Sequence, residues 1–252
     1  MNPVVRTIAV NLIDAAFAKK CAGGRPRVFT ASRIIDLLIL MCQTSQAWHH
    51  LPGTDGKYKT LHRNFMQLTR MGVFAELHRR VIRLYTRRRP AKHHITDTSN
   101  IKNVLGTDVI GRCYTDRGRM ATKLSTVTDD IGVALLFNLF PGNKSDQKVL
   151  PETLGTYRPP RGTEFFADKG YDSRANRAFV CGLGYRDRIS KRGQRRMPNG
   201  NRKRIRIEHS YARLKQFRHL RQRYDKLAIA YASFVAIAIT VVVSQVMTGL
   251  KI

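Results

Sequence analysis

One carboxylate stands inside a strongly basic stretch of the chain. Glu208 is the only acidic residue between Arg188 and Tyr224. A carboxylate in such a place repels a phosphate backbone unless a divalent cation lies between the two. The combination therefore predicts a metal-dependent enzyme that acts on nucleic acid. The basic residues around it are Lys191, Arg192, Arg195, Arg196, Arg202, Lys203, Arg204, Arg206, Arg213, Lys215, Arg218, Arg221 and Arg223.

Two more carboxylates follow stretches that have the composition of strands. Asp97 is expected at the end of one strand, and Asp168 at the end of a second one that begins at Glu164. Open α/β folds place ligands at the rim of the sheet, where such residues lie. Together with Glu208, they can hold two divalent ions for in-line phosphoryl transfer, and hard oxygen ligands favour Mg²⁺, with Mn²⁺ as a substitute. Asp172 is an alternative to Asp168.

Glu208 is expected on a helix that runs from Arg204 to Arg223. Arg204 lies four residues before Glu208 and Lys215 seven residues after it, so the three share one helix face. The simpler interpretation is that Glu208 only forms a surface pair with Arg204, which would contribute little. The adjoining face is expected to dock on the sheet and carries Ile207, Tyr211 and Leu214.

Charge and composition indicate the class of partner. The 252 residues carry a formal net charge of +29, and 42% are hydrophobic, as in a globular protein. Such an excess of positive charge points to a polyanion, DNA or RNA; a basic protein of the membrane surface is the less favoured alternative. The four cysteines form no CxxC pair, which argues against a structural zinc site and fits reduced thiols in the cytoplasm.

Two segments raise the question of a membrane. Residues 227–250 contain no charged residue and have the length of a bilayer span, but their polar residues favour a buried core helix. At the N-terminus, Asp14 interrupts the apolar stretch and no small-residue cleavage site follows it, so a signal peptide is not expected.

The apolar spacing divides the chain near residue 90. Helical periodicity before that point predicts a small all-α module in residues 1–90, with Thr30 or Ser32 as the cap of one helix. Residues 91–252 alternate between strand and helix patterns, which predicts a mixed sheet with flanking helices and a C-terminal core helix. Strands are expected near residues 94–97, 120–127, 133–140, 164–167 and 185–190, and helices near 146–154 and 173–183.

Several short motifs, taken in order, resemble those of insertion-sequence DDE transposases of the group five type within the group four superfamily. The resemblance runs from about Gly24 to Val242. Such enzymes carry a Tyr-x2-Arg-x3-Glu-x6-Lys signature, which Arg204, Glu208 and Lys215 match in spacing, whereas Asn201 replaces the tyrosine. The other similar stretches include Gly24–Arg27, Trp48–Pro52, Asp97–Lys102, Thr122–Leu124, Pro141–Gly142 with Asp146, Ala167–Asp172 and Arg223–Lys226.

The resemblance implies an RNase H-like catalytic fold in which Asp97, Asp168 and Glu208 bind the metal ions. Arg204 and Lys215 would contact DNA near the scissile phosphate. The remaining expected DNA contacts are Arg206, Arg213, Lys169, Arg202 and Lys203.

The resulting hypothesis is a cytoplasmic, DNA-associated transposase that cuts element ends and joins their 3′-hydroxyls to target DNA. Because two ends must be held together, a homodimer or higher oligomer on DNA is expected, and no membrane. Two alternatives stay open: a catalytically silent DNA-binding protein derived from a transposase, and an RNase H-like nuclease without strand transfer.

Overall fold

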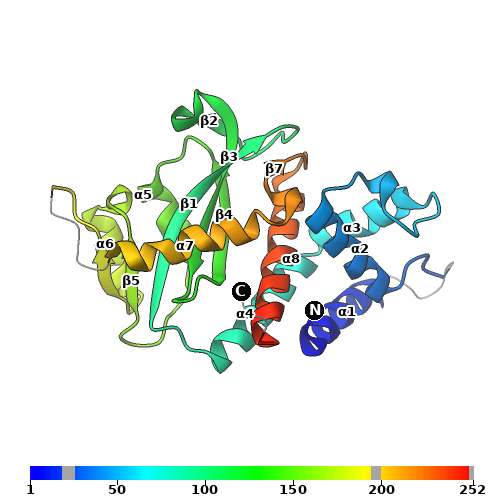
Figure 1. The fold of residues 1–252 in the computed structure, drawn as a ribbon, viewed down its shortest axis with the longest axis horizontal. Coiled ribbons are helices and arrows are strands. Elements are labelled where there is room, and N and C mark those ends of the chain that lie inside the picture. Colours follow the sequence, from blue (N-terminus) through cyan, green and yellow to red (C-terminus); the bar gives the residue numbers. More distant parts are fainter. Residues whose placement is uncertain (19–25, 194–199, 250–252) are drawn as a thin grey trace. The chain divides into compact units, whose positions relative to one another are not determined.

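The computed structural model describes residues 1–18, 26–193 and 200–249, and the side chains of residues 200–204 also lie outside the description. The chain forms two compact units (Figure 1). The first, here called the helical unit, contains residues 1–87, 214–221 and 227–252, and the second, the sheet unit, contains residues 88–213 and 222–226.

The helical unit has the helices that the apolar spacing predicts. The hydroxyl of Thr30 accepts a hydrogen bond from the backbone N–H of Arg33 (3.2 Å), which confirms Thr30 as the cap of α2. The helices of this unit are α1 (Pro3–Ala18), α2 (Ala31–Thr44), η1 (Trp48–His50), α3 (Tyr58–Arg70), α4 (Val73–Arg88), η4 (Arg218–Leu220) and α8 (Ala228–Met247).

Helix α8 is the core of the helical unit. The ring of Phe234 stacks on that of Phe65 in α3 (4.8 Å between centroids), and the hydroxyls of Ser233 and Thr69 lie 3.1 Å apart. Among the described residues, α8 is the one helix long and apolar enough to cross a membrane, but 78% of its apolar window is buried in the protein. This grouping differs from the expected one, in which the C-terminal helix belonged with residues 91–226, because the apolar faces of the N-terminal helices cover it.

The sheet unit is built on a seven-stranded mixed sheet in the order β2-β3-β1-β5-β6, with β4 beside β3 and β7 beside β1. Strands β1, β3 and β4 pair antiparallel, whereas β5 pairs parallel to β1 and β6 parallel to β5. The strands are β1 (His93–Asn103), β2 (Gly111–Cys113), β3 (Arg119–Thr128), β4 (Ala134–Pro141), β5 (Glu164–Ala167), β6 (Arg186–Ile189) and β7 (Gln222–Arg223).

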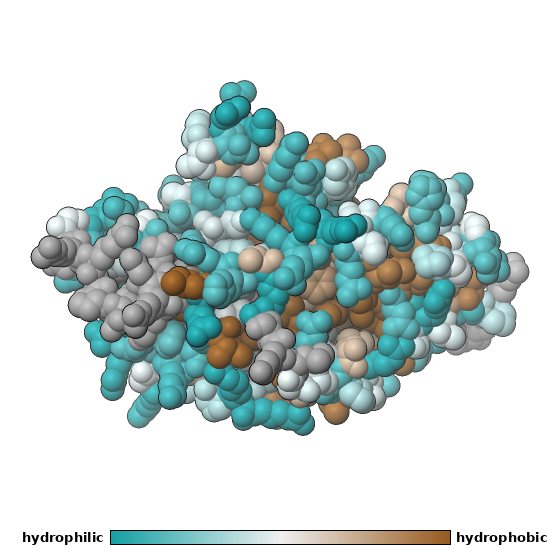
Figure 2. Space-filling model, in the orientation of Figure 1, coloured by the Kyte–Doolittle hydropathy of each residue, from teal (hydrophilic) through white to brown (hydrophobic). Residues whose placement is uncertain are grey.

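Helices cover both faces of this sheet. On one face, α5 (Asp146–Leu154) and α6 (Arg174–Gly182) enclose an apolar core. On the other face, α7 (Gly200–Leu214) crosses the strands (Figure 1). The surface around α7 is mainly hydrophilic (Figure 2). The core on the α5 side contains Val127, Phe140, Val149, Leu150, Leu154, Phe165, Ala167, Tyr171, Val180, Leu183, Tyr185 and Ile189.

Candidate active site

Asp97 and Asp168 occupy corresponding positions on neighbouring parallel strands. The register of β1 and β5 pairs His93 with Glu164 and Ile95 with Phe166. Continued by two residues, this register brings Asp168 level with Asp97. Neighbouring strands lie about 4.8 Å apart, and residues at the same level point to the same face. The two carboxylates that the sequence analysis singled out are therefore neighbours.

Their common face is the one that α7 covers. On the opposite face, the hydroxyl of Thr153 in α5 donates to that of Ser125 in β3 (2.9 Å). Ser125 pairs with Thr98, so Thr98 shares the α5 face and its neighbour Asp97 points to the α7 face.

Asp97 does not end its strand as expected, because β1 continues to Asn103. The polar residues that follow Asp97 stay in the sheet because β3 supplies an antiparallel partner for each residue as far as Lys102. The parallel pairing of β1 with β5 stops before Asp97, because its last pair joins Ile95 to Phe166 and β5 ends at Ala167. Asp97 thus still lies beside the carboxyl end of a strand, as the sequence argument required.

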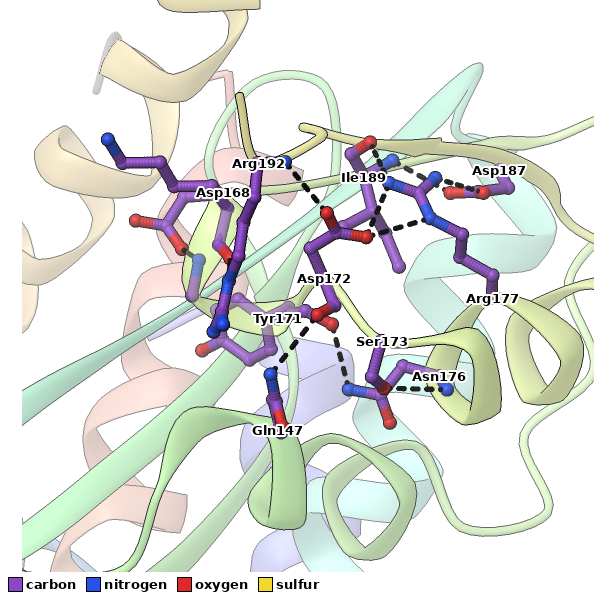
Figure 3. A network of polar contacts seen from close by, with 12 residues as sticks. Gln147, Asp168, Tyr171, Asp172, Ser173, Asn176, Arg177, Asp187, Ile189 and Arg192 are labelled. Atoms are coloured by element: carbon purple, nitrogen blue, oxygen red, sulfur yellow. Dashed lines mark hydrogen bonds and ion pairs between the residues drawn. The ribbon is translucent and has the colours of Figure 1, made fainter. Parts of the chain in front are cut away.

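Asp168 follows β5 directly and begins the short helix η3 (Lys169–Tyr171). Its Oδ1 accepts a hydrogen bond from the backbone N–H of Gly170 (2.6 Å), which fixes the orientation of the carboxylate. The rest of this loop is held from two helices (Figure 3): Gln147 in α5 donates to the carbonyl oxygen of Asp172 (3.1 Å), and Asn176 in α6 donates to that of Tyr171 (2.9 Å).

Asp172, the alternative ligand, is engaged in a structural network (Figure 3). Its Oδ1 accepts from Nε of Arg177 (3.0 Å) and its Oδ2 from the backbone N–H of Arg192 (2.8 Å). The backbone bond from Arg192 and the guanidinium of Arg177 lower the pKa of Asp172. Arg177 also pairs with Asp187. Both oxygens of Asp172 are therefore in use, which favours Asp168 as the ligand.

A third carboxylate that the sequence analysis did not assign lies near Asp168. This carboxylate belongs to Asp146, the first residue of α5. A Cβ added to Gly170 would stand 3.5 Å from Oδ2 of Asp146 and 2.8 Å from Oδ1 of Asp168, so the two carboxylates lie on the same side of Gly170. The hydroxyl of Tyr171 is buried and has no hydrogen-bond partner among the described residues. Burial raises the pKa of Tyr171 well above its usual value, with further contributions from the charges of Asp146, Asp97 and Asp168.

Helix α7 is fixed to the strand that carries Asp97. The hydroxyl of Tyr211 lies 2.7 Å from the carbonyl oxygen of Asp97 and 3.1 Å from that of Leu124. At the β3–β4 turn, the carbonyl oxygen of Arg206 lies 2.6 Å from the position of a Cβ on Gly132, so only glycine permits this approach. Ile207 and Tyr211 are buried, which confirms the predicted docking face.

Glu208 lies on the exposed side of α7, one turn before Tyr211. Glu208 is thus carried by the helix that covers the face of Asp97 and Asp168 (Figure 1). Among the described residues, no group of three histidine, cysteine, aspartate or glutamate side chains has the arrangement of a metal site. The three-carboxylate assignment stays a prediction.

The predicted helix from Arg204 to Arg223 was too long. Helix α7 ends at Leu214, and Lys215 stands in the following turn, where its carbonyl oxygen accepts a hydrogen bond from Nε of Arg221 (2.7 Å). The chain turns there because the next apolar residue, Phe217, is buried in the helical unit. Lys215 is therefore not part of the same helix face as Glu208.

The remaining expected DNA contacts fall into three groups. Arg206 and Lys169 are exposed on the sheet unit, and Lys215 is exposed on the helical unit. Arg213 is half-buried. The side chains of Arg202, Lys203 and Arg204 lie outside the described residues.

Residues 93–243 match the family described as the transposase DDE domain. The chain belongs to this family. The DDE domain includes all the strands of the sheet together with α5, α6 and α7. Membership implies a general dependence on divalent metal ions, and the donors at the site are hard carboxylate oxygens, which suit such ions.

Two known proteins are similar to this DDE transposase domain protein. A candidate transposase for insertion sequence element IS402 from Burkholderia cepacia is 30% identical over 129 residues, which is 48% of this chain and 61% of that protein. The chain thus aligns with less than two thirds of that relative. A solved structure, the piggyBac transposase synaptic complex with hairpin DNA, aligns with a TM-score of 0.52 at 10% identity, over 98% of this chain and 74% of that one. The fold is RNase H-like, as expected.

Proposed function

We propose that this protein is a transposase that cleaves DNA at the ends of an insertion sequence and joins the freed 3′-hydroxyls to target DNA. The observation that carries the proposal is the register of β1 and β5, which, continued by two residues, would set Asp168 beside Asp97 on the face that α7 covers. Because α7 also carries Glu208, the three acidic residues of the family motif come from separate elements of one sheet unit.

Each part of the site has a definite task in this reaction. Asp97, Asp168 and Glu208 would hold Mg²⁺, or Mn²⁺ as a substitute, and these ions would activate the attacking hydroxyl and stabilise the leaving oxygen. The backbone N–H of Gly170 orients Asp168 for this purpose. Arg206 and Lys169, both exposed on the sheet unit, would position the phosphate backbone, with Arg204, Arg202, Lys203, Arg213 and Lys215 as further contacts.

The excess of 46 lysine and arginine residues over 17 acidic ones supports DNA as the partner. Two element ends must be held together for joining, so the active form would be a homodimer or a higher oligomer on DNA. A protein with this task would act in the cytoplasm, bound to DNA and not to a membrane; the burial of α8 supports this.

A cleavage and joining assay tests the proposal. The substrate is a labelled duplex that contains the DNA flanking the coding sequence, incubated with a target plasmid and Mg²⁺ or Mn²⁺. A transposase yields both nicked ends and a joined product. Nicking without joining would indicate a nuclease without strand transfer. Binding without nicking in either metal would indicate a silent DNA-binding protein and would contradict the proposal.

The DNA-binding surface is tested by the salt dependence of affinity. Replacing Arg195, Arg196, Arg202 and Lys203 together with alanine should reduce the salt slope, by about one unit for each phosphate that the protein no longer neutralises. Arg195 and Arg196 lie outside the described residues. The matched control replaces Arg79, Arg80, Arg83 and Arg87 of α4. An equal reduction in both variants would show that the effect comes from net charge alone.

A further inference from the structure

The carboxylate of Asp146 has one oxygen in use and one available. Its Oδ1 accepts hydrogen bonds from Nζ of Lys123 (2.8 Å) and from the hydroxyl of Thr98 (3.1 Å). Nζ of Lys123 also donates to the carbonyl oxygen of Lys144 (2.7 Å), so the ammonium is held in place. By contrast, Oδ2 of Asp146 makes no hydrogen bond to the described residues. Asp146 is thus fixed from one side.

The available oxygen lies toward Asp168. Both Oδ2 of Asp146 and Oδ1 of Asp168 lie within 3.5 Å of the point where a Cβ on Gly170 would stand. Gly170 does not have a positive φ, so its backbone conformation is open to other residues. A Cβ at this position would come too close to Oδ1 of Asp168, at 2.8 Å, and would be in ordinary contact with Oδ2 of Asp146, at 3.5 Å.

The hydroxyl of Tyr171 is an independent sign of a ligand. Its side chain is fully buried, its hydroxyl lacks a partner among the described residues, and the charged groups that act on it are Asp146, Asp97 and Asp168. A buried hydroxyl without a partner is costly and rare in folded proteins. The carboxylates of Asp146 and Asp168 are among the charged groups that act on this hydroxyl, so it belongs to the same polar cluster.

We propose that Asp146 and Asp168 form a divalent-cation subsite, with Asp146 as an additional acidic ligand beyond the three of the family motif. Mg²⁺ keeps several of its waters and is commonly bound by one or two carboxylates together with substrate phosphates. The inference rests on the proposed function, since the cation would serve the same phosphoryl transfer.

Lys123 has a defined part in this subsite. Its ammonium offsets the charge of Asp146 and so reduces repulsion between Asp146 and Asp168. The same ammonium competes with a cation for Asp146. Removing it should therefore strengthen cation binding if Asp146 is a ligand, and should do so more than removing a nearby lysine charge that does not contact Asp146.

The experiment measures Mn²⁺ binding to the full-length protein without DNA, from the paramagnetic resonance signal of the free ion. We expect Asp146→Asn to raise the Kd for Mn²⁺ at least tenfold. Asp116→Asn, an equal change of charge on the exposed β2–β3 hairpin, should leave the Kd unchanged. An unchanged Kd in folded Asp146→Asn would overturn the subsite.

If Asp146→Asn does not fold, as judged by circular dichroism, Lys123→Met decides. A Kd lowered several-fold more than in Lys148→Met, a control on an exposed lysine of α5, supports the subsite, and an equal, unchanged or raised Kd overturns it. These outcomes are distinct from a failure of the proposed function, which is measured as DNA cleavage and joining.

Discussion

The hydroxyl of Tyr211 lies 2.7 Å from the carbonyl oxygen of Asp97. This single contact joins the helix that carries Glu208 to the strand that carries Asp97. Burial raises the pKa of Tyr211 well above its usual value, so the hydroxyl keeps its proton and remains a donor. The position of α7 on the sheet thus depends on a residue three positions after the predicted ligand.

Tyr211→Phe should loosen this connection. The change removes the hydroxyl that lies within hydrogen-bond distance of the carbonyl oxygens of Asp97 and Leu124. The loss of this hydrogen bond should lower the free energy of unfolding by about 1–3 kcal/mol. Urea unfolding followed by circular dichroism measures the decrease. Tyr224→Phe is the matched control, because the Tyr224 hydroxyl is on an exposed side chain and, within the described part of the chain, donates to the side chain of Gln222. Equal stability of the two variants would show that the contact does not hold α7.

Glu208→Gln should separate catalysis from DNA binding. The substitution keeps the size of the side chain and removes the charge that would hold a cation, so we expect strand cleavage in Mg²⁺ to be abolished. DNA affinity without metal should be equal or higher, because an anion has left a basic surface. Glu152→Gln, on an exposed residue of α5 paired with Lys144, is the control. Normal cleavage by Glu208→Gln would remove Glu208 from the site.

Gly170→Ala should displace the carboxylate of Asp168. The new Cβ would stand 2.8 Å from Oδ1 of Asp168, closer than such atoms approach, and 3.5 Å from Oδ2 of Asp146. A shift of about 1 Å at a reacting group can reduce the rate about a hundredfold, and we expect a decrease of that order in cleavage. The Cβ of Gly182→Ala meets no atom of the described residues within 4 Å, and this substitution should leave the rate unchanged. Similar rates for both variants would contradict the assigned position of Asp168.

Asp172→Asn should affect stability more than chemistry. Asp172 and Asp187 both pair with Arg177, so the substitution leaves this guanidinium with one carboxylate instead of two. We expect a lower Tm and retained cleavage at temperatures well below it. Asp168→Asn should show the reverse, with cleavage abolished and little change in Tm. If Asp172→Asn abolished cleavage while the protein stayed folded, Asp172 would be the ligand.

His94 should make the sheet unit less stable in acid. Burial, together with the charge of His93, lowers the pKa of His94 to about 4, against an ordinary value near 6.5. The unfolded chain therefore binds a proton that the folded one does not, and stability falls as the pH falls from about 6.5 to 4, by about 3 kcal/mol in total. In His94→Gln, the free energy of unfolding, measured with urea, should decrease less between pH 6.5 and 4. In His50→Gln, a change at an exposed histidine, it should decrease as much as in the protein without a substitution.

The amino-acid pattern predicted the sheet unit well where strands and helices have unambiguous periods. The bounds expected for α5 and β5 agree with the structure, because Asp146–Leu154 begins with a helix-favouring acidic turn and Glu164–Ala167 is bounded by turn residues. Asp168 could be placed at a strand end because the apolar run stops there. The position of Asp97 inside its strand could not be predicted, because the polar residues after Asp97 do not indicate that β3 pairs with them.

The remaining differences arise where contacts distant in sequence decide the structure. Strand β7 has two residues, which are too few to show the alternation of apolar and polar residues that predicts a strand. It forms because Gln222 pairs with Lys102 of β1. The end of α7 depends on a hydrogen bond between Arg221 and Lys215 and on the burial of Phe217. Asp146 was not assigned a role because an acidic residue in the first turn of a helix is common for electrostatic reasons alone.

The path of the chain between its two units has a consequence for the gene. The segment Gln222–Lys226 returns to the sheet unit, held by the fully buried guanidinium of Arg223 and its pair Asp108, before α8 enters the helical unit. A premature stop codon just after Lys226 would leave every acidic residue of the family motif encoded. It would nevertheless remove the helix around which residues 1–87 fold. An element copy truncated at its 3′ end would thus lose its N-terminal unit first.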